Sequence, residues 1–405
     1  MTNNKDKKVL NVPNLRFPEF TGEWKKERLD EIAELSKGIG ISKEQLSSNG
    51  NPCILYGELY TKYKSEIISE VISKTNIEKN KLKHSKQNDV IIPCSGETAV
   101  DIAVARCVPF DNVLLGGDLN IIRLHKYDGA FMAYQLNSKR KIEIAKLAQG
   151  VSVVHLYGEN LKSINTFNPS LQEQQKIVRL LSLLDERIKV QNKIIEDLKK
   201  LKSAISKHLF VRKDLLETTI CLSNIATLKN GYAFQSGKYN ALGKWKILTI
   251  TNVPGERYIN DENCNCIINL PNDIQDHQVL KEGDILISLT GNVGRVSLCK
   301  NGDYLLNQRV GLLQLAKNVN REYLYQILSS QRFENSMIAC GQGAAQMNIG
   351  KVDVESYVLP YSSNGNNILW VAKILHSYDE RIINELRRLT LLTMQKQYLL
   401  TQMFI

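Results

Sequence analysis

The sequence predicts an α+β protein made by internal duplication, in which two globular α/β domains are separated by two long antiparallel coiled-coil helices. Two observations lead to this prediction. An apolar seam with helical spacing occurs twice, and the segments that precede the two seams repeat one another in order. At 405 residues, the chain is long enough for about two to three domains. A repeated unit therefore accounts for its length.

The first apolar seam lies within residues 170–213, and its members recur mostly three, four or seven positions apart. They are Ile177, Leu181, Leu184, Ile188, Ile195, Leu198, Ile205 and Leu209. A shift of 194 positions gives the second seam, within residues 362–405: Val371, Leu375, Tyr378, Ile382, Leu389, Leu392, Leu399 and Met403. A polar residue interrupts both seams at the same place, Gln191 in the first and Glu385 in the second. We hypothesise that this polar position fixes the helix register.

Each long helix needs an apolar partner for its seam, because packing rather than propensity stabilises such a helix. About 40 residues make a helix roughly 60 Å long. The best-matched partner in the chain is the other seam, and duplicated chains usually close with two-fold symmetry. We therefore expect an antiparallel pair with the globular domains at opposite ends. Parallel packing, or packing against another chain, also fits the pattern.

The two helices set the expected domain boundaries. The first globular domain covers residues 1–169, with a polar tether at 1–20, and the second covers residues 214–361. Ser170 is the expected N-cap of the first long helix, and Glu173 is its expected capping-box partner.

Local signals recur in the same order in both globular domains. A short apolar segment ends at Gly38 in the first domain and at Gly231 in the second. A compact run of apolar residues then predicts a buried strand at 89–92 and again at 284–287. Longer amphipathic stretches predict one helix at Phe131–Leu147 and one at Tyr323–Ile338. The repeat therefore extends over the whole chain.

Composition limits the class of protein. The formal charge is +11, from 53 Lys and Arg against 42 Asp and Glu, which favours a polyanionic partner, either nucleic acid or an anionic surface. No apolar run approaches the roughly 20 residues of a membrane helix. The eight cysteines lack zinc-knuckle spacing and read as reduced thiols. We expect a cytoplasmic protein without a membrane segment.

Motifs for catalysis are missing from the sequence. There is no Gly-x4-Gly-Lys-Ser/Thr phosphate loop, no Gly-x-Gly-x-x-Gly fingerprint and no Asn/Asp-Pro-Pro-aromatic run. The six histidines show no metal-ligand spacing. We therefore expect a chain that is not an enzyme by itself and that holds no metal.

Two similar basic domains suit a target with two similar sites, and duplex DNA is such a target. Asn and Gln pair with adenine, Arg pairs with guanine, and Lys contacts phosphates. The candidate DNA-binding residues are Lys62, Tyr63, Lys64, Ser95, Glu97 and Thr98 in the first domain, and Tyr232, Phe234, Asn292, Arg295, Asn307, Gln308, Arg309, Gln342 and Gln346 in the second. The candidate helix-packing or partner-docking residues are Ile177, Leu181, Leu184, Ile188, Ile195, Leu198, Leu375, Tyr378, Ile382, Leu389 and Leu392.

Several stretches resemble the specificity (S) subunit of type I DNA restriction–modification enzymes. The first is Asn168-Pro169-Ser170-Leu171-Gln172-Glu173-Gln174-Gln175-Lys176-Ile177, followed by Leu183-Leu184-Asp185-Glu186-Arg187-Ile188. Further matches are the Trp24–Gly38 segment, Gly283-Asp284-Ile285-Leu286 and Asn307-Gln308-Arg309-Val310. The resemblance spans essentially the whole chain. One departure is the start of the second long helix, 362–367, which lacks the Gln-Glu-Gln-Gln run.

The resemblance implies a function that spacing alone does not. Each globular domain would be a target-recognition domain that reads one half of a bipartite, asymmetric DNA sequence. The long helices would fix the half-site spacing and dock two modification (methyltransferase) subunits, which bind S-adenosylmethionine and methylate adenine. Two restriction subunits would use ATP and Mg to translocate and cleave DNA. This chain itself would hold no cofactor. Two alternatives are a helical protein-interaction scaffold without sequence-specific DNA binding, and a nuclease or methyltransferase with a diverged site.

Overall fold

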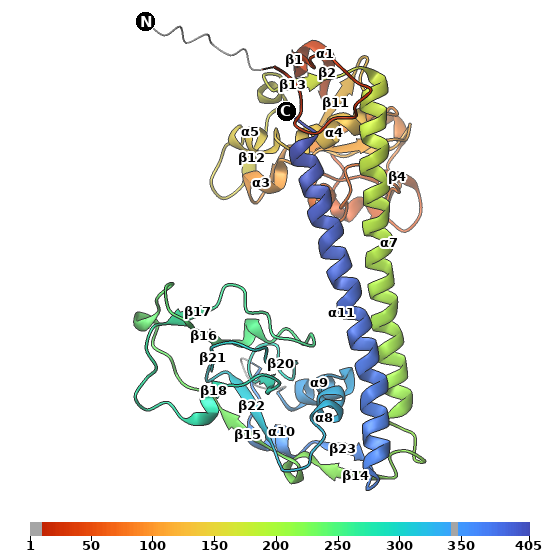
Figure 1. The fold of residues 1–405 in the computed structure, drawn as a ribbon. Coiled ribbons are helices and arrows are strands. Elements are labelled where there is room, and N and C mark those ends of the chain that lie inside the picture. Colours follow the sequence, from red (N-terminus) through yellow and green to blue (C-terminus); the bar gives the residue numbers. More distant parts are fainter. Residues whose placement is uncertain (1–9, 342–346) are drawn as a thin grey trace, which may run out of the picture. The chain divides into compact units, whose positions relative to one another are not determined.

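The computed structural model describes residues 10–341 and 347–405. The chain divides into two compact units, one made of Met1–Asn192 with Arg388–Ile405 and the other of Lys193–Arg387. Each unit combines a globular head with one end of the long helix α7 (Leu171–Leu209) and one end of the long helix α11 (Gly365–Gln402) (Figure 1). None of the helices in these described ranges is long and apolar enough to cross a membrane.

The first head, residues 10–168, is built around a four-stranded antiparallel sheet in the order β2-β11-β7-β9. A five-stranded sheet has the order β3-β5-β4-β10-β6, with β10 parallel to β4. Two further pairs are β1-β13 and β12-β8. The strands are β1 (Lys25–Arg28), β2 (Ala33–Lys37), β3 (Leu46–Ser47), β4 (Asn51–Ile54), β5 (Ser73–Thr75), β6 (Lys83–His84), β7 (Asp89–Pro93), β8 (Ser95–Gly96), β9 (Arg106–Val108), β10 (Leu114–Leu115), β11 (Leu119–Leu124), β12 (Val154–His155) and β13 (Asn165–Asn168). The helices are α1 (Leu29–Ile32), α2 (Glu58–Thr61), α3 (Ala99–Ile102), α4 (Gly129–Asn137), α5 (Lys141–Lys146) and α6 (Gly158–Leu161).

The second head, residues 214–361, repeats this plan. Its four-stranded antiparallel sheet has the order β15-β22-β19-β20, and a second sheet has the order β17-β16-β21-β18 with β16 parallel to β21. The pair β14-β23 corresponds to β1-β13. The strands are β14 (Thr218–Cys221), β15 (Ala226–Asn230), β16 (Trp245–Leu248), β17 (Asn265–Ile267), β18 (Val279–Leu280), β19 (Ile285–Ser288), β20 (Val296–Leu298), β21 (Tyr304–Leu306), β22 (Val310–Leu315) and β23 (Val358–Tyr361). The helices are α8 (Arg321–Leu328), α9 (Gln331–Cys340) and α10 (Lys351–Glu355).

The predicted buried strands are the central strands β7 and β19. Val90 and Ile92 pack into one apolar cluster of the first head, whereas Ile91 packs into the other. In the second head Ile285 and Ile287 join one cluster and Leu286 joins the other. Alternate side chains of a strand point to opposite faces of a sheet, so each central strand lies between two apolar layers. This explains why three consecutive residues are apolar in each strand, Val90–Ile92 in β7 and Ile285–Ile287 in β19, rather than every second one.

The expected helices at Phe131–Leu147 and Tyr323–Ile338 are each two helices, so that prediction is wrong in detail. In the first head α4 ends at Asn137, and its side-chain amide bonds both the N–H and the C=O of Ala105 at 2.7 and 2.9 Å. In the second head Ser330 starts α9 as its N-cap, accepting from the N–H of Phe333. Side-chain bonds to the backbone favour helix ends over helix interiors, and the apolar spacing alone did not reveal them.

The predicted N-cap of α7 is confirmed, but its partner differs from the prediction. Ser170 Oγ accepts from the N–H of Glu173 at 3.3 Å. The Glu173 carboxylate, however, accepts a two-atom bond from Arg16 at 2.7 and 2.8 Å and a third bond from Trp24 Nε1. The side chain is 1% exposed. Glu173 therefore fastens the N-terminal segment to the start of α7 instead of closing a capping box.

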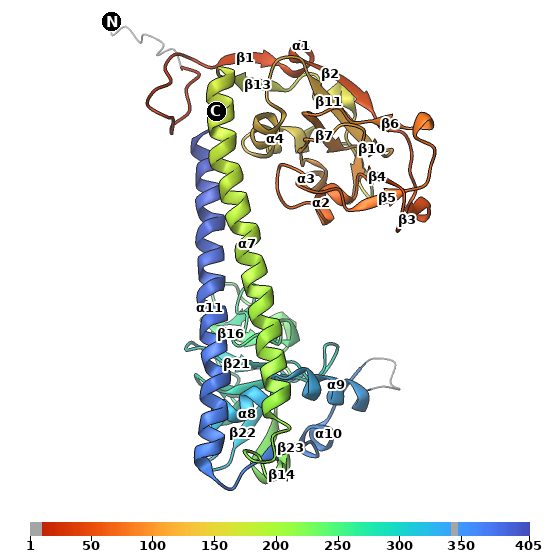
Figure 2. The same ribbon diagram turned by 90° about the vertical axis from the view of Figure 1, so that its right-hand side faces the viewer.

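The two long helices lie side by side within each unit, and they run antiparallel as predicted (Figure 2). In the first unit Ile177 and Leu181, near the start of α7, share an apolar cluster with Leu400 and Met403, near the end of α11. In the second unit the end of α7 packs on the start of α11 through Leu209, Val371 and Leu375. All eleven candidate packing residues are buried or half-buried.

Candidate nucleic-acid interface

Backbone hydrogen bonds bring three loops of the second head together. Tyr232 N–H donates to Leu306 O at 2.8 Å, and Gln308 N–H donates back to Tyr232 O at 3.0 Å. Leu289 N–H donates to Arg309 O at 3.0 Å, which joins the turn after β21 to the turn after β19. Most of the residues predicted in this head therefore fall on neighbouring loops: Tyr232, Phe234, Asn292, Arg295, Asn307, Gln308 and Arg309. Gln342 and Gln346 lie outside the described residues.

A glycine allows this close approach in each head. A Cβ added to Gly231 would lie 2.2 Å from Asn307 O, and one added to Gly38 would lie 1.9 Å from Gly116 O. Real Cβ atoms do not approach backbone so closely. The repeated glycines noted in the sequence therefore hold the loop after the first strand of each main sheet against the turn before β11 or β22.

The candidate side chains of the second head differ in their exposure to solvent and in whether they already bond other residues of the head. Asn292, Gln308 and Arg309 are exposed. Asn307 Oδ1 instead accepts from the N–H of Arg309 at 3.2 Å, so part of this amide holds the turn. Arg295 Nε lies 3.3 Å from Glu334 Oε1. Arg309 and Gln308 are thus the better placed of the group to meet a ligand.

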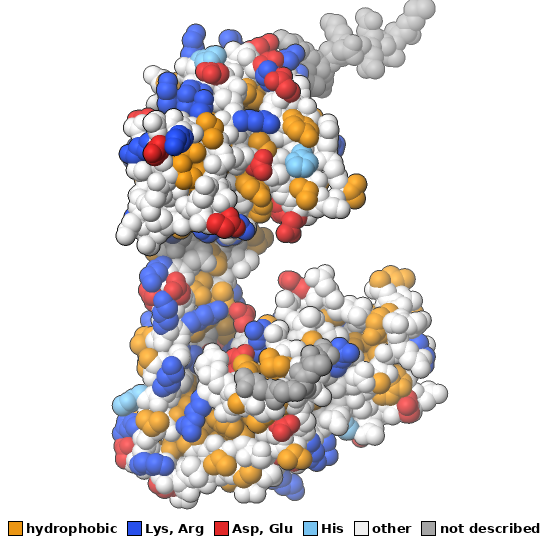
Figure 3. All heavy atoms as spheres, turned by 180° about the vertical axis from the view of Figure 1, so that it is seen from behind, with side chains coloured by type: hydrophobic (Ala, Val, Ile, Leu, Met, Phe, Trp, Pro, Cys, Tyr) orange, Lys and Arg blue, Asp and Glu red, His pale blue; other side chains and the backbone are white. Residues whose placement is uncertain are grey.

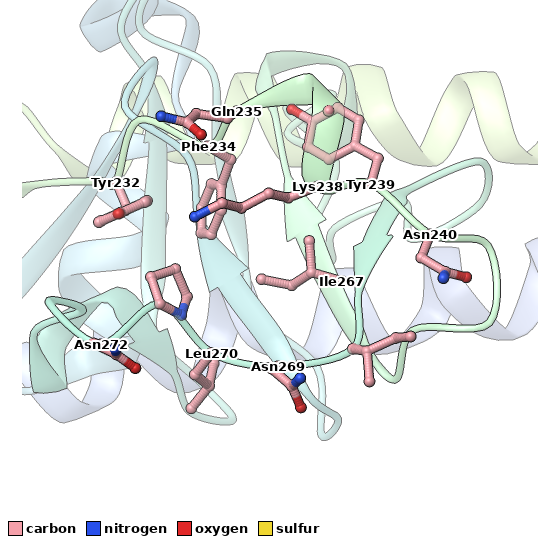
Figure 4. A pocket seen from close by; sticks show the side chains of 13 residues that line it. Tyr232, Phe234, Gln235, Lys238, Tyr239, Asn240, Ile267, Asn269, Leu270 and Asn272 are labelled. Atoms are coloured by element: carbon pink, nitrogen blue, oxygen red, sulfur yellow. The ribbon is translucent and has the colours of Figure 1, made fainter.

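A hollow of about 440 Å³ lies beside this loop cluster. Tyr232 and Phe234 line it with ring centroids 4.8 Å apart, and Tyr232 Oη donates to Asp273 at 2.8 Å. Figure 4 shows that Phe234, Lys238 and Ile267 line the same hollow. The side-chain amides of its wall belong to Gln235, Asn240, Asn269 and Asn272. Aromatic faces beside amide groups form the kind of surface on which nucleobases stack.

The lysine-and-tyrosine stretch of the first head lies after the short helix α2. Lys62 Nζ bonds the buried carboxylate of Glu58 at 2.7 Å, and Lys64 Nζ donates to Thr61 O at 3.0 Å. Tyr63 is 6% exposed, its hydroxyl accepts from the N–H of Ile72, and burial raises its pKa to about 12. Tyr63 therefore belongs to the core and does not present its side chain to a ligand, contrary to its predicted role.

The second candidate loop of the first head contains residues 95–98. Ser95 is 6% exposed, and its Oγ donates to Asp118 Oδ2 at 3.2 Å. Like Tyr63, it is therefore buried in the head and does not present its side chain to a ligand, contrary to its predicted role. Glu97 and Thr98 are exposed. Thr98 Oγ1 also accepts from Asp101 N at 3.1 Å as the N-cap of α3. Of this loop, Glu97 is the candidate whose side chain is offered to solvent.

Equivalent positions carry opposite charges in the two heads. Asp118 directly precedes β11, and Arg309 directly precedes β22, the strand in the same place of the repeated sheet. Both side chains are exposed. Figure 3 shows Lys and Arg side chains at the surface of both heads, together with acidic and apolar ones. The same scaffold therefore offers different chemistry at matching loops.

Apolar side chains also lie exposed on the part of the long helices that belongs to the first unit, and they are not among the residues predicted from the sequence. Leu391, Met394 and Tyr398 on α11 are 65, 62 and 59% exposed. Leu183 and Val190 on α7 are 52 and 53% exposed. Their signal in the sequence is that they are apolar but fall outside the seam. Exposed apolar side chains that lie close together are typical of a binding face.

Repeated α/β heads that offer unlike side chains at matching loops, each joined to a long helix, define a duplicated protein with two recognition heads. The family model described as "Type I restriction modification DNA specificity domain" matches residues 21–200 and 217–392. The chain therefore belongs to this family and is a type I restriction–modification specificity subunit with two DNA-recognition domains.

Individual relatives agree with this assignment. The type I restriction enzyme MjaVIII specificity subunit of Methanocaldococcus jannaschii is 24% identical over 361 residues, which cover 82% of this chain and 80% of that protein. The putative type I restriction enzyme specificity subunit S.HindORF215P of Haemophilus influenzae is 28% identical over 190 residues, covering 44 and 46%.

Solved structures show the same fold. The type I restriction–modification S subunit of M. genitalium has a TM-score of 0.60 at 19% identity, covering 97% of this chain and 99% of that one. A chain from a structural study of the assembly and conformational transition of the type I R-M system has a TM-score of 0.55 at 16% identity, covering 94 and 97%.

Proposed function

We propose that this chain is the non-catalytic subunit that sets DNA sequence specificity in a type I restriction–modification complex, with each head reading one half of a bipartite, asymmetric site. The observation that carries the proposal is the unlike chemistry at matching loops. Asp118 and Arg309 occupy the same place in the repeated sheet and are both exposed. Two heads with one scaffold and different contact residues suit two different half-sites.

Direct readout in the second half-site would come from the loop cluster around the β21–β22 turn. The Arg309 guanidinium has the paired donors that match the O6 and N7 acceptors of guanine, and the Gln308 amide matches adenine. Exposed lysines such as Lys64 would contact phosphates, which position the protein but do not distinguish bases. The formal charge of +11 favours that electrostatic contribution.

The long helices would fix the half-site spacing and dock two modification subunits. Leu183, Val190, Leu391, Met394 and Tyr398, the exposed apolar group of the long helices in the first unit, support a protein partner there, because a partner would bury apolar area that water now contacts. The modification subunits would supply S-adenosylmethionine, and two restriction subunits would supply the ATP and Mg chemistry. The complex would act in the cytoplasm, where the DNA to be modified lies.

A helical protein-interaction scaffold without sequence-specific DNA binding is the alternative function, favoured by the same exposed apolar group. Binding of the chain, with its methyltransferase partner, to DNA duplexes at several salt concentrations separates the two. Phosphate contacts predict an affinity that falls steeply with salt, on the order of 10³-fold between 50 and 200 mM. Competition by random duplexes then measures sequence preference. Binding without salt dependence or preference would favour the scaffold.

A further inference from the structure

A buried polar cluster joins the first head to both long helices. Asp185 on α7 accepts bonds from Tyr134 Oη at 2.6 Å and Ser65 Oγ at 2.9 Å, both from the head. Lys396 on α11 lies 2.5 Å from the same carboxylate and 2.6 Å from Glu66 of the head. The Asp185, Lys396 and Glu66 side chains are only 11, 13 and 8% exposed. We call these five residues the first cluster.

A second cluster joins the second head to the long helices in the same way. Asp379 on α11 accepts from Lys202 on α7 at 2.6 Å, and from Gln326 Nε2 and Arg257 Nη1 of the head at 2.6 and 3.0 Å. Arg257 also bonds Glu322 at 2.6 Å. The Asp379 and Arg257 side chains are each 8% exposed, and Lys202 is 18% exposed. Asp379, Lys202, Gln326, Arg257 and Glu322 form the second cluster.

The long helices contribute residues from the same two repeat positions to both clusters. Asp185 and Asp379 are 194 positions apart, and so are Lys202 and Lys396. Each cluster therefore takes its acid from one repeat and its lysine from the other. The lysine that serves the first head lies on the C-terminal helix, 330 residues from Glu66.

The head part of the two clusters has matching positions but different chemistry. Tyr134 and Gln326 each lie six residues after the N-cap of α4 or α8, which are Asp128 and Asn320. Ile67 and Tyr258 form matching bridges to the strands β9 and β20, and the residue before each bridge is an acid, Glu66, in the first head and a base, Arg257, in the second. The same aspartate and lysine positions of the helices therefore pair with an acidic head residue in the first cluster and with a basic head residue in the second.

We propose that these two clusters are positioning sites that orient each recognition head on the helix pair, so that reading of a half-site depends on a lysine from the opposite repeat. The first head then depends on Lys396 and the second on Lys202. This inference rests on the proposed function and adds the residues that keep each head in its reading orientation. None of these residues is expected to touch a base. Buried pairs that lose one partner leave an uncompensated charge, which favours tilting or local release of the head.

The test compares Lys396→Met with Lys202→Met in the full chain assembled with its methyltransferase partner. The substrates are duplex libraries in which one half-site is randomised and the other is kept. The expected result is reciprocal: each variant loses discrimination at least tenfold in one half-site and keeps it in the other, and the two variants affect opposite halves. Lys→Arg at either position should restore discrimination, because the charge is kept. Lys200→Met is the control, since that lysine is exposed and pairs with Glu196 one turn away.

Amide hydrogen exchange tests the same proposal without DNA. Lys396→Met should speed exchange in α4 and around residues 63–68, and Lys202→Met should speed it in α8 and around residues 255–259, each leaving the other head unchanged. Uniform acceleration in both heads, or none in either, would overturn the proposal. A further outcome is that exchange is reciprocal but the wild-type complex methylates DNA without site preference. The clusters would then still position the heads, whereas the proposed function and the role of the clusters in half-site reading would be wrong. Variants that both relax the same half-site would refute the half-site assignment alone.

Discussion

Lys202 on α7 bonds Asp379 on α11 at 2.6 Å, and the pair joins two copies of one repeat. The reciprocal pair, Lys396 with Asp185, is formed at 2.5 Å by the same two repeat positions exchanged between the helices. The Asp-Glu-Arg-Ile motif, the closest local match between the two halves of the sequence, begins with Asp185 and Asp379 in turn. In both copies, the first residue of the motif therefore bonds a head and a lysine of the opposite long helix.

Asp379→Leu should lower the free energy of unfolding of the second unit by about 3–5 kcal/mol. The physical reason is that Lys202 and Arg257 would remain buried without their shared carboxylate. Urea denaturation measures the free energy of unfolding, and native-state hydrogen exchange in α8 shows whether the second unit is the part affected. The control is Asp197→Leu on α7, because Asp197 and its partner Lys193 are exposed and such pairs contribute about 0–1 kcal/mol. Equal losses in the two variants would contradict a structural role for the Asp379 cluster.

Stability of the second unit should fall as the pH drops below the ordinary carboxyl range. Burial raises the pKa of Glu322, but hydrogen bonds from Arg257 and Gln326 outweigh it and leave that pKa below its usual 4.5. A lowered pKa in the folded state means that the stabilisation is fully present above pH 4.5 and is lost as the pH falls toward the folded pKa. Melting temperatures between about pH 6 and 3 measure this. Glu322→Gln should flatten the decline, and an unchanged slope would refute this assignment.

Arg309→Ala should relax discrimination in one half-site by roughly 10- to 100-fold, the about 1–3 kcal/mol expected of a bidentate base contact. Lys317→Ala is the matched control, because Lys317 is an exposed cation at the other end of β22. Methylation of duplexes altered at single positions gives the readout. A uniform loss over all sequences would make Arg309 a phosphate contact, and no effect would remove it from the interface.

Gly231→Ala should distort the loop cluster of the second head and destabilise it by about 1–3 kcal/mol, the usual cost of forcing extra atoms into a packed site. The new Cβ would lie 2.2 Å from the backbone oxygen of Asn307. Gly237→Ala, a few residues away, meets nothing within 4 Å and serves as the control. Thermal melting and half-site discrimination are the two measurements. Equal behaviour of the two variants would mean that the close approach at Gly231 does not constrain the loop.

Replacing Leu391 and Met394 together by serine should weaken binding of the methyltransferase partner by roughly 10- to 100-fold, as expected when a buried apolar contact of an interface is lost. The two side chains are 65 and 62% exposed in this chain, so its own stability should change little. Titration calorimetry measures the affinity. Leu242→Ser, at a 91% exposed leucine of the second head, is the control. Unchanged affinity in the double variant would place the partner elsewhere.

Periodicity was sufficient to predict the features that depend on it. The seams at Leu181 and Leu375, both fully buried, follow from a 3.6-residue repeat, and the central strands β7 and β19 follow from short apolar runs. Pairing of the two seams was expected because the best partner for one seam is its copy, and the antiparallel direction was expected from two-fold symmetry, although parallel packing also fitted the pattern. These features are local, or they are copies of one another, and a single sequence records both.

Contacts between dissimilar, distant residues were not predictable in this way. Glu66 and Lys396 are 330 residues apart, and nothing in the spacing of either marks the other. Tyr63 was predicted to bind DNA because Lys62 and Lys64 flank it, yet its side chain is buried in the core. Burial in an irregular segment has no periodic signal, so the sequence did not reveal it. Asn137 at the end of α4 and Ser330 before α9 form side-chain bonds to the backbone that apolar spacing does not reveal.

The proposed specificity function can be tested by mapping methylated adenines across the genome of a strain with and without this chain. If each head reads one half-site, one motif of two separated, unlike halves is methylated only when the chain is present. Arg309→Ala should also relax one half of that motif and leave the other intact. Methylation that persists unchanged without the chain, or that follows no bipartite motif when the chain is present, would rule out this function.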